Sequence, residues 1–217
     1  MSNAPDSQKD DKRDAETRSR HLRIVEPSPW VRRFAGLIPA TGPVLDLAAG
    51  NGRHARFLIG LGHRVVAIDR DGQALNGLAD AAKARVIVAD LETGQDPFQA
   101  TGPLGGMAFA GIVVVNYLYR PLLPVLLGAL APGGVLLYET FARGNERFTR
   151  PRNPDHLLRS GELLELAAGG LQVVAYEHGL IEAAEIPGVK QRICAVNDLG
   201  PSARDDGEPA PHPIPPK

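Results

Sequence analysis

The sequence lacks the features that mark several large classes of protein. Cys194 is the single cysteine in 217 residues, which excludes an internal disulfide and a multi-cysteine zinc site. No apolar run approaches the roughly 18–20 residues of a membrane-spanning helix, and the first ten residues have no apolar region of a secretory signal. Net charge is nearly absent, because 24 Lys and Arg oppose 25 Asp and Glu, a formal charge of −1. This balance makes nucleic acid an improbable partner on electrostatic grounds, and we expect a cytoplasmic protein of one domain.

Both ends of the chain differ in composition from the middle. Residues 1–20 carry five acids and five bases but only three apolar side chains. Such a segment buries too little surface to offset its chain entropy. Residues 198–217 hold six of the 19 prolines, which remove backbone donors and block regular ladders. We therefore predict two disordered tails and a folded domain over residues 21–197.

Short runs of valine, isoleucine and leucine alternate with helical patterns in the first part of this domain. The runs are continuous, which indicates strands buried on both faces, as in a parallel sheet between helices. The repeated strand–helix order favours an open, doubly wound sheet. The predicted strands cover residues 44–47, 64–69, 85–89, 109–115 and 135–138, and the predicted helices cover residues 53–61, 74–82 and 121–131.

The pattern changes after residue 141. Ser160 is placed to cap a short helix over residues 161–168, and two strands over residues 171–178 and 190–196 resemble a hairpin at the sheet edge. The predicted fold class is therefore α/β, a doubly wound and mostly parallel sheet of seven strands with helices on both faces. Its last two strands form an antiparallel hairpin.

Polar residues follow the predicted strands at the edge where such sheets bind ligands. Gly50 and Gly52 form a turn that lets the backbone approach a ligand and opens a helix. Asp69 ends the second strand, where a carboxylate accepts both hydroxyls of a ribose. Asp90 ends the third strand, within reach of an adenine amino group. The alternative is a tight glycine turn with Asp46, Asp69 and Asp90 as solvated strand ends, and it explains three aspartates at successive strand ends less well than a nucleoside site does.

Two nucleoside cofactors fit the pattern. Gly50-x-Gly52-x-x-Ala55 meets the loose dinucleotide fingerprint, which would indicate an NAD(P)-dependent oxidoreductase. S-adenosylmethionine is favoured by Asp46, because an acid just before the glycine turn suits a cationic amino-acid group and sits badly beside a pyrophosphate. Asp90 supplies a further adenosine contact that a dinucleotide does not require.

Over residues 40–197 the sequence resembles the class I S-adenosylmethionine-dependent methyltransferases, which have a Rossmann-like fold. Ala48 stands where many members have the first glycine of the turn. Residues 50–54 and 158–164 are also similar to small bacterial methyltransferases of the tellurite-resistance type. The segments that carry the wider resemblance are the first motif at residues 44–52, the acidic strand end at 66–69, the adenine-contacting motif at 89–91 and the turn at 130–137.

This resemblance implies a methyltransferase that uses S-adenosyl-L-methionine and acts on a small-molecule acceptor. Methyl transfer needs alignment more than a fixed catalytic dyad, and a soft anion needs no general base, so no catalytic residue is assigned. No metal site is expected. The residues implied to bind the cofactor are Asp46, Ala48, Gly50, Asn51, Gly52, Arg53, Asp69, Arg70, Asp90, Leu91, Val115 and Asn116.

Candidate acceptor-side residues follow the fourth and fifth strands. Tyr117 and Tyr119 are aromatic faces that can surround a sulfonium, or they cover a helix start. Glu139 is placed to orient a substrate or to pair with Arg120. Trp30 precedes the sheet and either folds over the pocket or anchors the packing.

The segment from residue 141 to residue 154 is long, polar and rich in arginine, as functional lids often are. It is either a solvated loop or a site for an anionic acceptor. An RNA phosphate is one such anion, so a methyltransferase acting on RNA or protein stays open as an alternative. The sequence leaves the acceptor atom and the oligomeric state undetermined.

Overall fold

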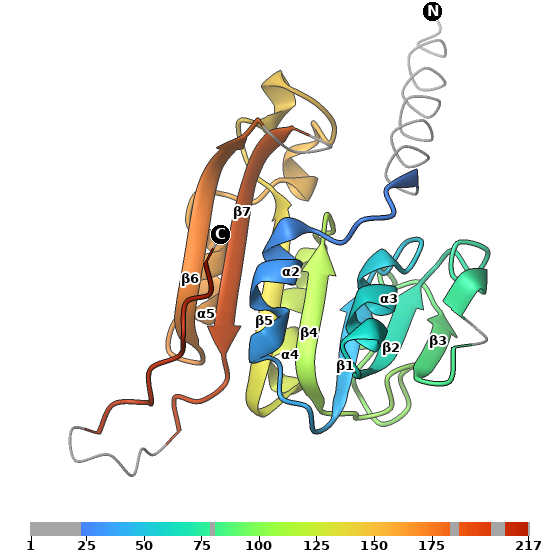
Figure 1. Cartoon of the computed structure of the whole chain (residues 1–217). Helices are drawn as coiled ribbons and strands as arrows, with labels where there is room; N and C mark the ends of the chain where they lie inside the picture. Colours follow the sequence, from blue (N-terminus) through green and yellow to red (C-terminus); the bar gives the residue numbers. More distant parts are fainter. Residues whose placement is uncertain (1–22, 79–80, 183–186, 201–206, 217) are drawn as a thin grey trace, which may run out of the picture.

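The structure is a computed structural model that describes residues 23–78, 81–182, 187–200 and 207–216. Its centre is a seven-stranded sheet in the order β3-β2-β1-β4-β5-β7-β6 (Figure 1). The first five strands pair in parallel, and β7 runs antiparallel to both β5 and β6. The strands are β1 Pro43–Leu47, β2 Arg64–Asp69, β3 Ala84–Val88, β4 Phe109–Val115, β5 Leu130–Phe141, β6 Gln172–Ile181 and β7 Gly188–Val196.

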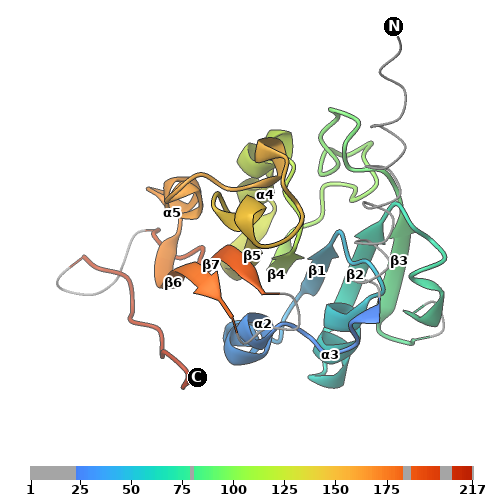
Figure 2. The same ribbon diagram turned by 90° about the horizontal axis from the view of Figure 1, so that it is seen from above.

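Helices cover both faces of the sheet. Seen from above in Figure 2, α2 and α3 lie on one side, and α4 and α5 lie on the other. Ile112 and Val114 of β4 belong to one buried cluster, whereas Val113 and Val115 belong to the cluster on the opposite face. This confirms the doubly wound fold, because burial on both faces requires an uninterrupted apolar run. The helices are α2 Pro29–Phe34, α3 Arg53–Gly60, α4 Leu123–Gly128 and α5 Glu162–Ala167.

The helix predicted over residues 74–82 is wrong in type. The segment predicted as a helix over residues 74–82 contains only a 3₁₀ turn, Asn76–Leu78, within the described residues, and residues 79–80 lie outside them. Leu75 and Leu78 still bury their side chains against the sheet, which produced the apolar spacing. Gly77 lies in the middle of this segment, and a helix-interior glycine costs about 0.5–1 kcal/mol.

The helix predicted over residues 121–131 is shorter than expected. A 3₁₀ turn, Arg120–Leu122, leads into α4, which ends at Gly128. The chain then enters β5 at Leu130, which pairs with Phe109 of β4. Residues 130 and 131, which the local apolar spacing assigns to the helix, therefore belong to a strand because β5 pairs with β4.

The cap predicted for α5 is also wrong. Gly161, with φ 78°, is the residue before the helix, and no side chain caps it. Ser160 is exposed. The Glu162 carboxylate instead accepts a hydrogen bond from the Arg159 N–H at 2.7 Å.

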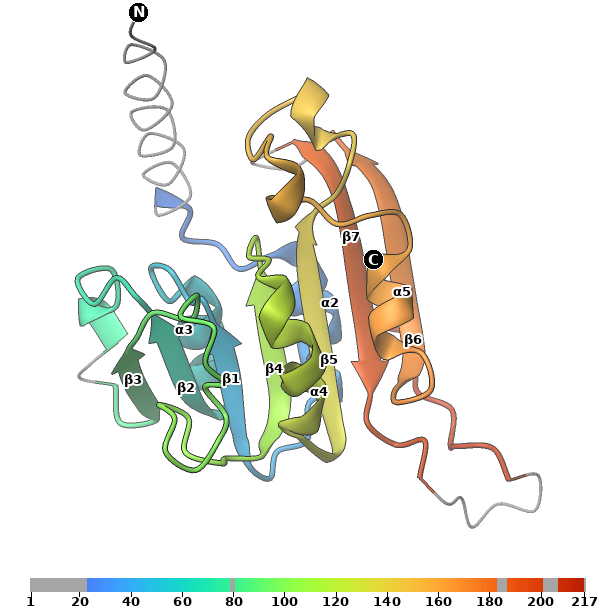
Figure 3. The same cartoon turned by 180° about the vertical axis from the view of Figure 1, so that it is seen from behind.

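The connection between β5 and α5 rises above the carboxyl end of β5 (Figure 3). It contains two 3₁₀ turns, Asn145–Arg147 and Pro154–His156, and an isolated bridge between Ala142 and Leu158. This segment is the arginine-rich one singled out from the sequence.

The predicted N-terminal tail lies outside the described residues, as do residues 201–206 and 217 of the C-terminal one, so the domain limits stay a prediction. Residues 207–216 form neither helix nor strand. They nevertheless return to the domain, because Arg33 of α2 donates a hydrogen bond to the Pro215 carbonyl at 2.8 Å.

Candidate functional site

The turn between β1 and α3 has a left-handed backbone at three positions. Ala48 and Gly50 have φ 56°, and Gly52 has φ 74°. A Cβ on Gly52 would lie 2.2 Å from Leu78 Cδ1, so both conformation and space require glycine there. Ala48 adopts a conformation that costs a non-glycine residue about 1–2 kcal/mol. The turn is therefore held in a strained shape by its surroundings.

Hydrogen bonds from β2 hold this turn in place. Asp69 Oδ2 accepts the Gly50 N–H at 2.8 Å, and Ile68 O accepts the Ala49 N–H at 3.0 Å. Asp69 Oδ1 accepts the Asp71 N–H at 2.9 Å. Since a carboxylate has about four acceptor positions, Asp69 retains capacity for a ligand hydroxyl.

The segment before α2 braces the turn from the other side. Asn51 Nδ2 donates to the Ile24 carbonyl at 2.8 Å, and Arg53 donates to the Glu26 carbonyl at 2.9 Å. The Asn51 side-chain oxygen accepts the Arg53 N–H at 3.1 Å and so caps the start of α3. This brace also engages the Arg53 guanidinium that the resemblance directs to the carboxylate of the cofactor.

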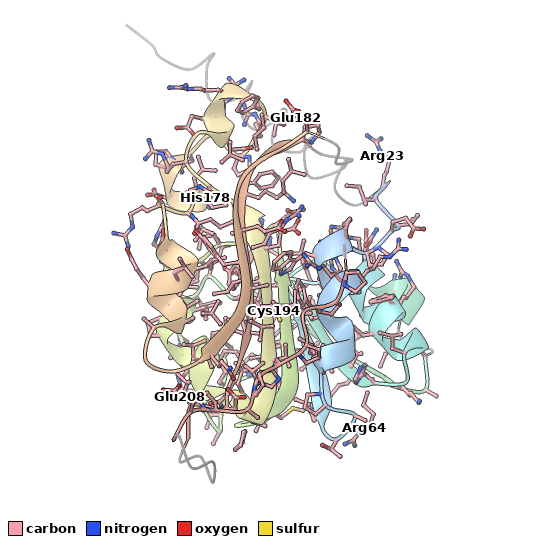
Figure 4. All side chains as sticks on the ribbon, turned by 60° about the vertical axis from the view of Figure 1, so that its left-hand side comes forward. Arg23, Arg64, His178, Glu182, Cys194 and Glu208 are labelled. Carbon is pink, nitrogen blue, oxygen red and sulfur yellow. The ribbon has the colours of Figure 1, made fainter. Side chains whose placement is uncertain are left out.

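A cavity of about 260 Å³ opens at the carboxyl ends of β1 to β4. In Figure 4 this edge is the one near Arg23 and Glu182, whereas Arg64, at the start of β2, lies at the opposite end of the molecule. Ten of the twelve predicted cofactor residues line the cavity. They are Ala48, Gly50, Asn51, Arg53, Asp69, Arg70, Asp90, Leu91, Val115 and Asn116.

Two predicted cofactor residues, Asp46 and Gly52, are not in the cavity lining. Asp46 lies beneath the turn, where its Oδ2 accepts the Ala55 N–H at 2.9 Å in the first turn of α3. Burial raises the pKa of this carboxyl to about 7, although the hydrogen bond from Ala55 opposes the shift. The structure thus gives Asp46 a position under the loop and no direct access to a ligand.

His54 lines the cavity from the first turn of α3. Its Nε2 accepts the Ser28 N–H at 3.2 Å, which assigns the ring proton to Nδ1, 4.0 Å from Asp46 Oδ1. Burial, with a smaller contribution from the Arg53 charge, lowers the pKa of His54 to about 3. The imidazole is therefore neutral at physiological pH.

Tyr117 lines the cavity on the side of Asp90 and Glu92. Burial raises the pKa of its phenol, and the negative charges of Glu92 and Asp90 act in the same direction. Its hydroxyl is buried and has no hydrogen-bond partner in the part of the chain that the structure describes.

The other predicted acceptor-side residues do not line the cavity. Trp30 is an anchor of the packing, because it is 2% exposed, contacts Phe34 at a centroid distance of 4.6 Å and donates to the Ile193 carbonyl at 3.1 Å. Tyr119 packs against the buried cluster under α4. Neither is in position to close the cavity.

Arg120 does not pair with Glu139, which corrects one of the two roles considered for that carboxylate. Arg120 makes two hydrogen bonds to Glu162, at 2.7 and 3.0 Å, and donates to the carbonyls of Asp155 and Leu157. It therefore fastens the segment before α5 to the 3₁₀ turn that leads into α4.

Glu139 instead belongs to a buried cluster behind the cavity. Lys190 of β7 donates to its Oε1 at 2.7 Å, and Ser28 donates to its Oε2 at 2.8 Å. Arg192 lies 3.1 Å from Oε2. Burial favours the neutral acid, but the charges of Lys190 and Arg192 outweigh it and hold the pKa of Glu139 below its usual value.

Sequence reasoning missed several residues of this region. Ala49, Ala89 and Glu92 line the cavity beside predicted residues. They could have been predicted, because each lies close to a strand end in the sequence. Lys190 had no such signal, because its contact with Glu139 depends on the antiparallel register of β5 and β7. No local spacing reveals that register.

The arginine-rich segment stands apart from the cavity lining. Arg143 pairs with Glu146 at 3.4 Å, and Arg147 and Arg152 are exposed. Among the described residues, no group of three or more His, Cys, Asp or Glu side chains is placed to hold a metal ion. Within the same residues, no helix combines the length and apolar content needed to cross a bilayer.

Comparison with solved structures shows that this fold is the one found in S-adenosylmethionine-dependent methyltransferases. No protein-family model and no curated protein matches the sequence. A protein solved in work on the conversion of a disulfide bond into a thioacetal group during echinomycin biosynthesis is 21% identical, with a TM-score of 0.59 over 85% of this chain and 87% of the other. TehB from Haemophilus influenzae is 17% identical, with a TM-score of 0.59 over 78% of this chain and 61% of TehB. The glycopeptide N-methyltransferase MtfA, solved with S-adenosyl-L-homocysteine, is 21% identical, with a TM-score of 0.53 over 77% and 88%.

Proposed function

We propose that this chain is an S-adenosyl-L-methionine-dependent methyltransferase that acts on a small-molecule acceptor in the cytoplasm. The observation that carries the proposal is the cavity at the carboxyl ends of β1 to β4, where the strained turn and the carboxylates of Asp69 and Asp90 meet. Ligands bind at this edge of open α/β sheets. The likeness of the whole sheet to that of known methyltransferases supports the same reading.

The sheet order favours this cofactor over a dinucleotide. Dinucleotide-binding folds place six parallel strands in the order 3-2-1-4-5-6. Here an antiparallel strand, β7, lies between β5 and β6.

The residues of the cavity fit an adenosine. Asp69 has acceptor capacity left for ribose hydroxyls, and Asp90 and Leu91 lie at the end of the next strand, where an adenine edge would be read. Tyr117 lines the cavity on the same side. Asn116, at the end of β4, lies near the place where the sulfur would be held. When bound, the cofactor supplies an activated methyl group, and the protein contributes alignment and exclusion of water.

The cavity has the size of the nucleoside part of the cofactor. Ligand pockets usually measure about 300–1,000 Å³, and this one measures about 260 Å³ before any ligand enters. A nucleoside would occupy most of that space. The arginines of the 141–154 segment stand outside the lining, so nothing in the cavity itself favours RNA or a protein as the acceptor.

Binding measurements test the cofactor. We expect S-adenosyl-L-homocysteine to bind the full chain with micromolar affinity in calorimetry. Asp69→Asn should weaken binding at least about tenfold, because a hydrogen bond to a charged group contributes about 1.5–3 kcal/mol. Asp96→Asn is the matched control, because Asp96 caps a turn at the Phe98 N–H outside the cavity. Binding of NAD(H) without binding of S-adenosyl-L-homocysteine would establish the oxidoreductase instead.

A labelling experiment tests the acceptor class. The protein is incubated with cell extract and S-adenosylmethionine labelled in its methyl group, and the extract is then separated into small molecules, RNA and protein. We expect label in the small-molecule fraction. Label confined to RNA or to protein would overturn the acceptor proposed here and leave the cofactor assignment intact.

A further inference from the structure

A lysine reaches the cavity beside Asn116 from β7, which lies two strands away from β4 in the sheet. Lys190 lies in β7 and is 6% exposed. Its ammonium group donates a hydrogen bond to Asn116 Oδ1 at 2.9 Å and another to Glu139 Oε1 at 2.7 Å. Asn116 is part of the cavity lining, whereas Lys190 and Glu139 lie behind it. Among the described residues, Asn116 is the cavity-lining side chain that Lys190 contacts directly, and Glu139 is linked to His54 of the lining through Ser28.

This contact fixes the orientation of the Asn116 amide. An ammonium group only donates hydrogen bonds, so the amide oxygen must face Lys190 and the Nδ2 group must face the other way. The backbone restricts the side chain further, because Asn116 has φ 57° and its N–H donates to the Glu139 carbonyl at 2.8 Å. Within the described residues no hydrogen bond engages Asn116 Nδ2. Its two N–H donors are therefore directed at whatever occupies the cavity.

The possible proton acceptors beside Asn116 are already engaged. Glu139 accepts from Lys190 on one oxygen and from Ser28 on the other, which also lies 3.1 Å from Arg192. His54 uses its Nε2 lone pair to accept the Ser28 N–H. Neither group is oriented to take a proton from a ligand.

The cluster also carries an excess of positive charge. Glu177 pairs with Arg192 at 3.4 Å and with Arg33 at 3.5 Å. Together with the Lys190–Glu139 pair, this makes three cations against two carboxylates, a surplus of one positive charge. A small anion beside Asn116 would be attracted by this surplus, whereas the positive charge of a bound sulfonium would be offset by the carboxylates of Asp69, Asp90 and Glu92 in the cavity lining.

We propose that Lys190 and Glu139 are positioning residues that hold the Asn116 amide as a hydrogen-bond donor to a small anionic acceptor with no proton on its attacking atom. This inference rests on the proposed function. The attacking lone pair forms the bond to the methyl carbon while the carbon–sulfur bond breaks. The electron pair of that bond remains on the sulfur, and no proton is transferred.

The side-chain amide of Asn116 reports on this arrangement by NMR. Full-length, ¹⁵N-labelled protein is saturated with S-adenosyl-L-homocysteine and titrated with thiocyanate, an anion without a proton. Asn116→Asp identifies the Asn116 side-chain resonances by their disappearance. We expect thiocyanate to shift these resonances in a saturable way and methylammonium to leave them unchanged.

Variants of the lysine separate a positioning role from a structural one. Lys190→Met should weaken thiocyanate binding at least about tenfold, and Lys190→Arg should restore part of it. Lys83→Met is the matched control, because Lys83 is an exposed lysine that contacts the Gly62 carbonyl away from the cavity. If Lys190→Met does not fold, the double variant Lys190→Met with Glu139→Gln is used in its place, because it removes both charges together and leaves no unpaired buried carboxylate.

The outcomes separate this inference from the proposed function. Calorimetry with S-adenosyl-L-homocysteine on the same samples tests the cofactor site directly. If that ligand binds but thiocyanate leaves the Asn116 resonances in place, the positioning proposal is wrong. The same conclusion follows if methylammonium shifts them, or if the lysine variant binds thiocyanate as wild type does. Failure to bind S-adenosyl-L-homocysteine would instead remove the proposed function.

Discussion

Ala48 has the most unfavourable backbone conformation of the turn that lines the cavity. Its φ of 56° suits glycine, and a methyl group there costs about 1–2 kcal/mol. We expect Ala48→Gly to raise the free energy of unfolding by about 1 kcal/mol, less the entropy that glycine adds to the unfolded chain. Urea denaturation measures the change. Ala49→Gly is the control, because Ala49 is buried and lacks a positive φ, so this substitution should destabilise the protein. Destabilisation by both variants would contradict the assignment of strain to residue 48.

Asp46 gives stability a pH dependence that can be isolated. Burial raises its folded-state pKa from 3.8 to about 7, so the folded chain keeps a proton that the unfolded chain releases. Its contribution is thus fully present below about pH 4 and is lost as pH rises through about 7. Asp46→Asn removes this titration and can still accept the Ala55 hydrogen bond. Unfolding free energies should be similar for the two proteins near pH 4, whereas the variant should be more stable at pH 8 by on the order of 3 kcal/mol.

His54 and every other group titrate in both proteins, so the difference between wild type and Asp46→Asn isolates residue 46. A difference that stays constant from pH 4 to pH 8 would show that Asp46 is ionised throughout.

Site residues were predictable where the chemistry is local in sequence. The glycine turn, Asp69 and Asp90 each sit at a strand end, and the parallel fold brings successive strand ends to one edge. Partners across antiparallel strands carry no such signal. Glu139 was considered a partner of Arg120, which is closer in sequence, yet β7 delivers Lys190 to it.

At the scale of elements, Arg120 joins two parts of the chain that the sequence does not connect. It pairs with Glu162 at the start of α5 and donates to two carbonyls of the preceding segment. Burial opposes the ionised form of Glu162, but the hydrogen bond from Arg120 and its neighbours hold the pKa of this carboxyl below its usual value. Arg120→Met should therefore destabilise the protein by about 2 kcal/mol, because the Glu162 carboxylate loses two hydrogen bonds and keeps the one from the Arg159 N–H.

The loss of stability in Arg120→Met should be greatest near the substituted side chain. Hydrogen exchange of residues 154–162 is expected to accelerate in Arg120→Met more than exchange in β1 or β4. Arg143→Met is the matched control, because Arg143 pairs with Glu146 at the exposed surface. Exposed ion pairs of this kind contribute about 0–1 kcal/mol to the free energy of unfolding. Equal effects of the two substitutions would argue against Arg120 as the fastening residue.

Strands were easier to predict than helices in this chain, for a physical reason. A strand buried on both faces is apolar throughout, so β2 and β4 were predicted at the residues where they occur. The helices are short and draw their stability from packing on the sheet. Apolar spacing around Leu75 and Leu78 therefore marks burial but does not require a helix.

At the scale of the whole molecule, the C-terminal segment and the cavity contact separate parts of the fold. The segment at residues 207–216 contacts Arg33 of α2 through Pro215, and His212 pairs with Asp198 after β7. None of these residues lines the cavity. Deleting residues 207–217 should therefore lower the free energy of unfolding by about 1 kcal/mol, the contribution of one or two hydrogen bonds, and leave ligand affinity unchanged.

Stabilisation by ligand tests this separation in the intact and shortened chains. A ligand at 100 times its dissociation constant stabilises the folded state by about 2.7 kcal/mol, whatever the starting stability. Both chains should therefore gain the same free energy of unfolding from saturating S-adenosyl-L-homocysteine, measured by urea denaturation at matched concentrations. A smaller gain in the shortened chain would mean that the segment helps to form the cavity, through α2 and the residues before it that brace the glycine turn.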